Sequence, residues 1–407
     1  MHVRERHSSN NSSELTTGAF TLTELDPPAF RRRLMNWYRA HARKLPWRGI
    51  TDPYRTWVSE VMLQQTRVAA VIEHYQAFLR LFPTIVALAL ADEEEVLAAW
   101  SGLGYYRRAR MLHKAAKFIT QERGGSLPRT SSELRTLPGI GEYTCAAIAS
   151  IAFGESIPVV DGNVERVLLR ILGRSQDGTA ARRTFVQNHA AALVPRRRMD
   201  KRTNAAGDHN QAMMELGATI CLPRAPLCLN CPVFSMCKTR GEHVTLPSAE
   251  QRSRPAAYLL SLRKKGPVTE VLLERRADDV SLMAGMYELP PLPLDVVKDR
   301  EPVLRVRHSI TNTNYYVQVF VPRNRNDRAL RRAVPAASSD LHWVRASRLL
   351  SLPLTGLARK ILQRLDIMDI HPIRLPEPDP EPARKKRGST STPDRLKSST
   401  RSSGARK

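Results

Sequence analysis

The sequence has no uninterrupted apolar run near the roughly 20 residues that a membrane-spanning helix needs, which argues against an integral membrane protein. Its first 20 residues are polar and lack the apolar core of a secretory signal. Aromatic residues make up only 6%, yet the hydrophobic share of 42% excludes a chain that is disordered throughout. Acidic residues are scarce, since 39 Asp and Glu stand against 64 Lys and Arg, a net charge of +25 over 407 residues. We therefore expect two or three domains and a polyanionic partner.

Cysteine is also rare, and four of the five cysteines lie within one short segment. Cys221, Cys228, Cys231 and Cys237 form the pattern C-x6-C-x2-C-x5-C. Without a secretion signal, this spacing indicates a metal centre rather than two disulfides. Zinc held by four thiolates is one alternative, although a zinc ribbon has two separated C-x2-C pairs; a compact loop suits a [4Fe-4S] cluster at least as well. Cys145 lies in an alanine-rich helical pattern, so we expect it to be a buried packing residue.

The pattern along the chain predicts two folded domains of different class. Residues 28–220 read as successive helices, among them one that starts at Asp52-Pro53 and one that starts at Asp161. Strand-like patterns begin at residue 257 and cover 257–264, 267–276 and 315–322, and a helix interrupted by Pro353 is expected over 347–365. The predicted fold class is a mostly α N-terminal domain followed by an α+β domain. The predicted boundaries are a disordered extension at 1–27, the helical domain at 28–240, a connector at 241–256, the α+β domain at 257–368 and a basic disordered tail at 369–407.

The segment LPGIG at residues 137–141 lies between two helical patterns. Gly139 and Gly141 allow a tight hairpin with positive φ and leave backbone N–H groups open at the start of the next helix. Such a helix N-terminus favours an anion, and it can contact a DNA phosphate whatever the base sequence. The alternative is an ordinary helical hairpin. The segment VVDGN, about 20 residues downstream, and the cysteine loop favour the phosphate site.

The order of these motifs resembles the helix-hairpin-helix DNA glycosylases that carry an iron–sulfur cluster. The matching stretches are LPWRG, WVSEVMLQQTRV, GLGYYRRAR, LPGIGEYT, VDGNVERV and the four-cysteine loop, over about residues 45–237. The resemblance implies two helical modules with DNA bound between them, a [4Fe-4S] cluster on the four cysteines, and a target base flipped out of the duplex.

The residue after the hairpin distinguishes branches of this superfamily. Bifunctional members carry a lysine two residues after the second glycine, where it forms a Schiff base. This chain has Tyr143 there, which cannot do so, and the resemblance is to the adenine glycosylases of the MutY family. We therefore expect a monofunctional enzyme that removes adenine mispaired with 8-oxoguanine or guanine. Two other hypotheses are a lyase that acts on oxidised pyrimidines and a non-enzymatic, redox-active DNA-binding protein.

Two carboxylates have contrasting surroundings in the sequence. Glu60 lies in an apolar helical stretch, where desolvation raises its pKa and retains a proton, so we expect it to be the general acid. Asp161 lies at a helix N-terminus, which favours the anion, so it can stabilise or trap an oxocarbenium ion. We expect Tyr143 to orient Asp161 or the intermediate, and Asn163 to position the water.

The resemblance assigns four further residues to base recognition. Gln65 and Tyr105 would insert into the base stack near the damaged partner base. Arg48 and Leu63 would line the adenine pocket or the side of the site that faces the partner base.

The C-terminal domain resembles the Nudix-like domain of the MutY family through LLERR at 272–276 and LMAGMYELP at 282–290. The acidic helix of an active Nudix hydrolase is missing after residue 290, so we expect a reader of 8-oxoguanine rather than a hydrolase. The family has a Phe-Ser-His loop after an Arg-His-Thr stretch, and the corresponding segment here is Arg307-His308-Ser309 followed by Ile310-Thr311-Asn312. Ile310 offers no aromatic face. We expect Ser309, Thr311 and Asn312 to contact the partner base.

Partners and location follow from these interpretations. We expect a monomer that binds double-stranded DNA with A:8-oxoguanine or A:G mispairs and no membrane. A bacterial chain is expected in the cytoplasm with the nucleoid, while nuclear and mitochondrial locations stay open. The segment 376–407, with 9 basic and 4 acidic residues, is either a solubilising end or a DNA-binding arm.

Overall fold

The computed structural model describes residues 25–175, 179–196, 204–243, 251–280, 282–322, 327, 330, 332–334 and 340–368. The described residues belong to one compact unit, and residues 374–407 lie outside them together with the predicted extension before residue 25. No helix among the described residues is long and apolar enough to cross a membrane.

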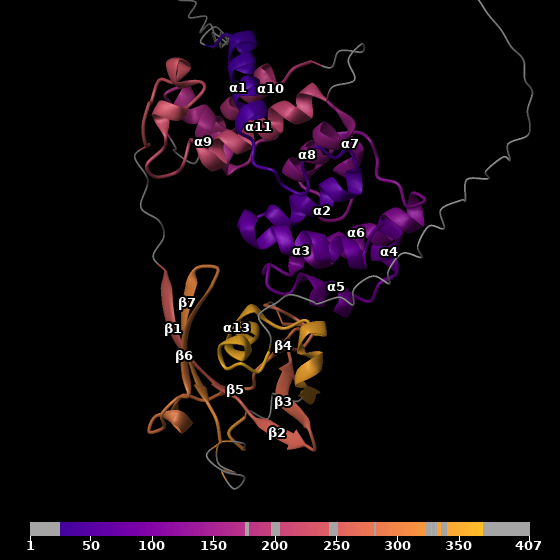
Figure 1. Cartoon of the computed structure of the whole chain (residues 1–407), viewed down its shortest axis with the longest axis vertical. Coiled ribbons are helices and arrows are strands. Elements are labelled where there is room, and N and C mark those ends of the chain that lie inside the picture. Colours follow the sequence, from indigo (N-terminus) through magenta and orange to yellow (C-terminus); the bar gives the residue numbers. More distant parts are fainter. Residues whose placement is uncertain are drawn as a thin grey trace, which may run out of the picture. The chain divides into compact units, whose positions relative to one another are not determined.

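The first part of the compact unit is helical, as the sequence predicts (Figure 1). Its helices are α1 (Pro27–His41), α2 (Pro53–Leu63), α3 (Val68–Leu81), α4 (Ile85–Leu90), α5 (Glu93–Trp100), α6 (Arg107–Glu122), α7 (Ser131–Leu134), α8 (Glu142–Phe153), α9 (Gly162–Ile171), α10 (Ala180–Leu193) and α11 (Ala205–Thr219). Two short 3-10 helices, η1 (Cys228–Asn230) and η2 (Phe234–Met236), follow in the cysteine loop.

Local sequence fixes where the helices that carry the site begin. The Asp52 side chain accepts hydrogen bonds from the backbone N–H groups of Tyr54 and Arg55, and Pro53 occupies the first helical position of α2. The Asp161 side chain caps α9 in the same way. Both helix starts confirm the predictions.

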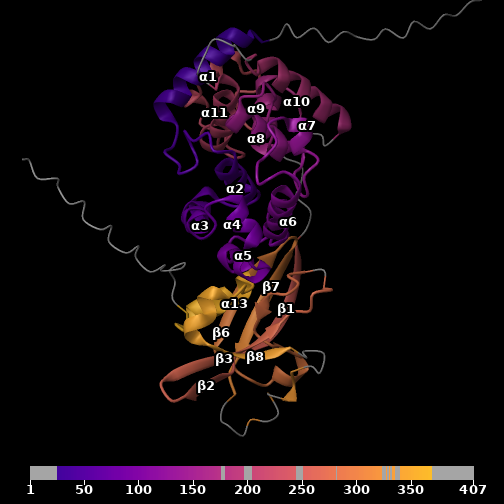
Figure 2. The same ribbon diagram turned by 90° about the vertical axis from the view of Figure 1, so that its right-hand side faces the viewer.

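Two apolar cores hold the helices together. The larger is built on α2 to α8 around Trp57, Phe78 and Trp100. The other joins α1, α9, α10 and α11 around Phe30 and Leu216, and both views show these four helices grouped together (Figures 1 and 2).

The second part of the unit is α+β, which confirms the predicted fold class. One sheet has the strand order β5-β1-β7-β6, with β1 (Arg252–Leu259) parallel to β7 (Thr313–Phe320), and β6 (Leu304–Ile310) antiparallel to β7. The other has the order β2-β3-β4, with β8 paired to β3. The remaining elements are β2 (Leu262–Lys265), β3 (Val268–Arg275), β4 (Tyr287–Glu288), β5 (Pro291–Leu292), η3 (Asp295–Val297), β8 (Leu341–Arg345), η4 (Ala346–Ser351) and α13 (Gly356–Arg364).

Two details of the predicted strands differ from the structure, and the sequence predicted no strand at β4, β5, β6 or β8. The pattern over 257–264 predicts one strand, but β1 and β2 divide it and belong to different sheets. β1 also begins at Arg252, inside the predicted connector. Its first four residues are exposed and show no strand-like apolar alternation. They form a strand because they pair with β7. Around Pro353 the chain forms η4 and then α13, with Thr355 as the N-cap of α13.

The helical and α+β parts meet at residues 101–106 and the segment before α13. The Ser101 and Tyr106 hydroxyls both donate to the carbonyl oxygen of Leu354, at 3.0 and 2.9 Å. Arg359 of α13 also donates to the Ser101 Oγ. These bonds fix the start of α13 against the end of α5.

Candidate active site

Three helix segments bring the predicted catalytic residues into one pocket of about 740 Å³. Glu60 comes from the middle of α2, Tyr143 from the first turn of α8, and Asp161 from the N-cap of α9. Arg48, Leu63, Gln65 and Asn163 also line this pocket. Residues up to 115 positions apart in the sequence (Arg48 to Asn163) thus face one cavity.

Glu60 is buried, with 5% of its surface exposed. Burial raises its pKa to about 7, partly offset by a hydrogen bond from Tyr143, and the nearby Asp161 carboxylate raises it further. The carboxyl is therefore protonated in a large fraction of molecules near neutral pH. It can donate a proton to a group held in the pocket.

Tyr143 makes its bond to a different carboxylate from the one expected. Its hydroxyl donates to Glu60 Oε2 at 2.6 Å rather than to Asp161. Burial, followed by the neighbouring Glu60, raises the pKa of this hydroxyl well above 10, so it stays a donor. The geometry makes Tyr143 a residue that orients Glu60.

Asp161 accepts hydrogen bonds at both oxygens. Oδ1 receives the backbone N–H of Val164 at 2.7 Å, and Oδ2 receives the Asn163 amide at 2.9 Å. An ionised carboxylate is an acceptor only, and these two donors hold its plane in place at the positive end of α9. Asn163 lies beside the site, as we expect of a residue that positions the water. It also orients Asp161 through this hydrogen bond.

A hydrogen-bond chain that the sequence did not indicate continues from Asn163 to the cysteine loop. Arg166, one turn along α9, donates to Asn163 Oδ1 at 2.9 Å and to the carbonyl oxygen of Cys221 at 2.8 Å. It also donates to the Gly217 carbonyl oxygen of α11. The loop and the carboxylate pocket thus share a rigid link through one guanidinium.

Glu215 lines the pocket, and the sequence analysis did not identify it as a site residue. Its side chain is 1% exposed and accepts hydrogen bonds from Arg43 and Arg48, with Arg43 Nη2 at 2.7 Å. Burial alone would raise its pKa, but the bonds from the two arginines outweigh burial and lower it to about 2. The only signal in the sequence was a glutamate on a densely apolar helix, which is the signal that identified Glu60.

The four predicted metal-ligating cysteines line one pocket, and all five cysteines are free of disulfides. Arg170, which is 3% exposed, donates to Cys221 Sγ at 3.4 Å, and the backbone N–H of Arg240 donates to Cys237 Sγ. Donors directed at sulfur suit bound thiolates. Among the described residues, no three potential ligands converge on a position for a single ion. Cys145 is buried in the core around α8, as expected.

The predicted hairpin connects α7 to α8, but its two glycines act differently. Gly139 has φ +72°, and a Cβ there would lie 2.5 Å from the Met111 Cβ. Gly141 is the extended N-cap of α8 with φ −88°, so only the first glycine needs positive φ. The second glycine stands where the first N–H groups of α8 are open.

A groove of about 810 Å³ collects several of the residues expected to contact the partner base or a DNA phosphate. Gln65, Tyr105, Gly139, Ser309 and Thr311 line it, whereas Gly141 and Asn312 do not. Gln65, Tyr105 and Thr311 have φ of 55°, 49° and 49°, a backbone conformation that costs free energy in a residue with a side chain. Tyr105 is 48% exposed. Strain concentrated at one groove indicates a functional surface.

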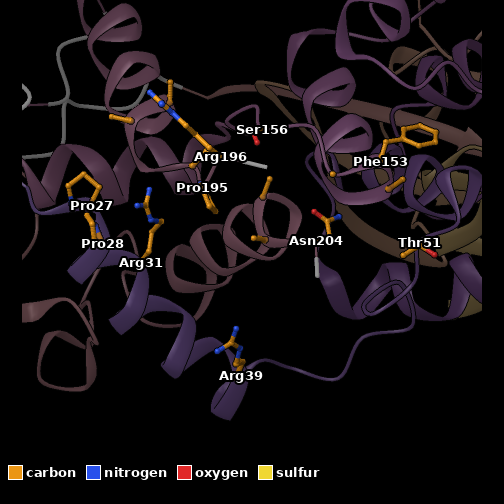
Figure 3. A pocket seen from close by; sticks show the side chains of 17 residues that line it. Pro27, Pro28, Arg31, Arg39, Thr51, Phe153, Ser156, Pro195, Arg196 and Asn204 are labelled. Carbon is orange, nitrogen blue, oxygen red and sulfur yellow. The ribbon is translucent and has the colours of Figure 1, made fainter. Parts of the chain in front are cut away.

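Another pocket, of about 1100 Å³, lies elsewhere (Figure 3). Arg31, Arg39 and Arg196 line it, and none of its described lining residues is a carboxylate, histidine or cysteine. It has no group for acid–base or nucleophilic chemistry beyond the hydroxyls of Thr51 and Ser156. The carboxylate pocket is therefore the candidate active site.

The comparisons with known proteins identify the family. Residues 58–190 match the family described as HhH-GPD superfamily base excision DNA repair protein. An adenine DNA glycosylase of Rattus norvegicus is 48% identical over 52% of this chain and 42% of its own length. One of Mycolicibacterium smegmatis is 43% identical over 51% of this chain and 68% of its own length. The chain thus covers less than half of the rat relative.

A solved structure described as a thermostable thymine-DNA glycosylase is also similar. It is 28% identical, with a TM-score of 0.47 over 53% of this chain and 96% of its own length.

Proposed function

Because the chain belongs to the adenine DNA glycosylase family, we propose that it excises adenine mispaired with 8-oxoguanine or guanine in duplex DNA. The single observation that carries this proposal is the pocket in which a buried, protonatable Glu60 and a doubly hydrogen-bonded Asp161 lie together with Tyr143. The reaction is hydrolysis of the N-glycosidic bond in base excision repair.

The two carboxylates have complementary roles in this mechanism. Glu60 donates its proton to a ring nitrogen of the flipped adenine, N7 or N3, which turns the base into a better leaving group. The bond from C1′ to the base breaks, and its electron pair leaves with adenine. Asp161 stabilises the oxocarbenium ion at C1′ or traps it covalently. Water, positioned by Asn163, then bonds to C1′, and its proton restores Glu60.

Arg48 and Glu215 suit recognition of the adenine. Both line the pocket, and the bond between them, together with Arg43, keeps the Arg48 guanidinium, 15% exposed, at one place in its wall. A fixed polar wall can distinguish one base edge from another at small entropic cost. Leu63 supplies an apolar contact.

The strained groove suits the partner base. Gln65 and Tyr105 would enter the stack, and the Ser309 and Thr311 hydroxyls would contact 8-oxoguanine. The Ser309 hydroxyl donates to Asn314 Oδ1 at 2.6 Å, and Thr311 occupies the β6–β7 turn. The backbone N–H groups at the start of α8 would hold a phosphate of the same duplex.

We propose a [4Fe-4S] cluster as the cofactor, held by Cys221, Cys228, Cys231 and Cys237. The shared pocket and the N–H donors to sulfur support it. When bound, the cluster would hold the basic loop that includes Arg224 and Lys238 in one shape. Iron and sulfide analysis and a broad visible absorption test the proposal, and a colourless protein with stoichiometric zinc would contradict it.

Base release from duplexes with adenine opposite 8-oxoguanine, guanine and cytosine tests the activity. Under single-turnover conditions we expect fast release from the first, slower release from the second and little from the third. Glu60→Gln and Asp161→Asn should each lower the rate by at least about 100-fold while duplex binding persists. Undiminished release in both variants would contradict the mechanism.

Trapping with borohydride tests the monofunctional assignment. A Schiff base between enzyme and DNA needs an amine at the reacting carbon, and Tyr143 supplies none at the hairpin position. We expect no efficient covalent trapping. Efficient trapping would instead favour the lyase on oxidised pyrimidines.

We also propose that the protein acts as a monomer. We propose that it is located with its DNA substrate, which is the nucleoid if the chain is bacterial and the nucleus or mitochondrion otherwise. Light scattering of the purified chain measures the first point, and localisation of a tagged chain the second.

A further inference from the structure

The outer face of the sheet β5-β1-β7-β6 is defined here by side-chain alternation along three of its strands. Residues directly paired across strands point to the same side, and the side changes at each residue. Arg307 pairs with Tyr316, which pairs with Pro255. The nine positions of the outer face are Arg305, Arg307 and Ser309 of β6, Asn314, Tyr316 and Gln318 of β7, and Ser253, Pro255 and Ala257 of β1.

The opposite face of this sheet is part of a core. Val306 and Val317 pack with Leu357 and Ile361 of α13, and both views place α13 against β6 (Figures 1 and 2). Two of the nine positions are buried among the described residues. Ala257, at the end remote from the β6–β7 turn, packs in a separate cluster with Leu292, Val297 and Leu330. Asn314, beside the turn, accepts a hydrogen bond from Ser309 and donates one to Gln251. The exposed positions form what we call the open half of the face: Arg305, Arg307 and Ser309 of β6, Tyr316 of β7, and Ser253 and Pro255 of β1.

This open half is basic and aromatic. Tyr316 is 51% exposed, and Arg305, Arg307, Ser309 and Pro255 are exposed around it. None of the nine outer-face positions is acidic. Neither guanidinium forms an ion pair with a carboxylate in the described part of the chain; the bond at Arg307 is accepted by its backbone carbonyl from Lys360.

We propose that the open half of the outer face binds the phosphate backbone of the duplex beside the β6–β7 turn. The proposal rests on the proposed function, since it extends the DNA-binding surface of the same protein. Arginine forms strong paired hydrogen bonds with phosphate oxygens, and an exposed tyrosine can pack on the sugar and donate to a phosphate. Arg305 and Arg307 lie two residues apart on one strand, about 7 Å, which is similar to the distance between neighbouring phosphates.

Continuity along β6 supports this occupant. The strand that carries Arg305 and Arg307 ends at Ile310 and leads into Thr311. Ser309, near the end of the strand, and Thr311 both line the groove proposed for the partner base. If the β6–β7 turn contacts a base, the DNA strand that carries this base continues past the turn. The positively charged outer face lies beside the turn and can contact that strand. The surface would hold the damaged strand in register through contacts that are independent of sequence.

The test compares two neutralised pairs in the full chain. Arg305→Gln/Arg307→Gln removes two charges from the outer face. Lys264→Gln/Lys265→Gln is the matched control, because it removes two exposed charges from β2, in the other sheet. Fluorescence anisotropy with a mispaired duplex at several salt concentrations measures affinity and its salt dependence, and melting temperatures confirm that each variant is folded.

We expect the arginine pair to lower affinity by about tenfold or more and to reduce the slope of log K against log [salt] by about 2. The lysine pair should leave both unchanged, and Arg305→Lys/Arg307→Lys should retain most of the affinity. Tyr316→Ala should weaken binding several-fold. An unchanged slope in the arginine pair, an equal loss in the lysine pair, or a loss confined to single-stranded DNA would overturn the proposal.

Adenine release by the unmodified chain decides the proposed function separately. A chain that releases no adenine but loses duplex affinity in the arginine pair would keep this surface and overturn the activity. A chain that releases adenine but has unchanged duplex affinity in the arginine pair would support the activity and overturn the proposed phosphate-binding surface.

Discussion

At the scale of single residues, the site depends on how differently the protein treats three glutamate and aspartate side chains. Glu60 lies among apolar groups with one hydroxyl donor, so its pKa rises to about 7. Glu215 is as deeply buried but faces two arginines, so its pKa falls to about 2. Asp161 receives two N–H donors at a helix start. Burial raises the pKa of both glutamates, and the donors that each one meets decide whether the effect of burial prevails.

The pH dependence of base release should reveal Glu60. Its acid form is the active one, so the single-turnover rate should fall as pH rises through about 7. The hydrogen bond from Tyr143 stabilises the ionised form, and Tyr143→Phe should therefore raise the pKa of Glu60 and move the descending limb to higher pH. Rate profiles from pH 5 to 9 measure the shift. A shift to lower pH would contradict the assigned hydrogen bond.

Glu60 should also make the fold less stable at high pH. Its pKa is raised in the folded state, so the cost is absent at low pH, where folded and unfolded chains are both protonated. The cost develops above the ordinary pKa of 4.5 and is complete once pH exceeds about 7. Glu60→Gln should therefore raise the free energy of unfolding at pH 8.5 by roughly 3 kcal/mol and change it little near pH 4.5. Denaturant titrations at both pH values measure this, and an equal effect at both would contradict it.

At the scale of elements, the hairpin between α7 and α8 depends on one glycine more than the other. Gly139→Ala would have to adopt positive φ and place a methyl 2.5 Å from the Met111 Cβ. We expect it to lower stability by about 1–3 kcal/mol and to weaken duplex binding. Gly141→Ala is the matched control, since its φ is −88° and its nearest neighbour would be Arg135 Nη1 at 3.7 Å. Equal losses in the two variants, measured by thermal unfolding and anisotropy, would show that the turn geometry is not the cause.

The link from Asn163 through Arg166 to Cys221 is another property of elements rather than of residues. It joins the N-terminus of α9, the end of α11 and the cysteine loop. A change in the shape of the cysteine loop can therefore alter the position of Asp161 through Arg166 and Asn163.

At the scale of the whole molecule, the net charge of +25 is divided among surfaces with different roles. The α+β part has exposed arginines beside its β6–β7 turn, while the helical part has the N-terminus of α8 at the hairpin. The tail 376–407 contributes +5 of the total.

Removing the tail tests whether its charge matters. A chain that ends at residue 375 should release adenine at the unchanged single-turnover rate, and its duplex affinity at high salt should fall little. Reduced affinity at low salt alone would agree with a non-specific electrostatic contribution. Loss of base release in the truncated chain would contradict this expectation.

From the sequence alone we could infer the change from a helical to an α+β domain, the starts of α2 and α9, the hairpin, the cysteine loop and the two carboxylates. All of these are local signals: a cap, a proline, a pair of glycines, or a charged residue in an apolar run. Tertiary structure decided which partner each group meets. Tyr143 donates to Glu60, and Glu215 binds two arginines from a distant loop. β1 and β2 separate into two sheets, and Tyr316 pairs with Arg307 across β6 and β7. Side-chain partners depend on the packing of segments far apart in the chain, and no local pattern records the distance between them.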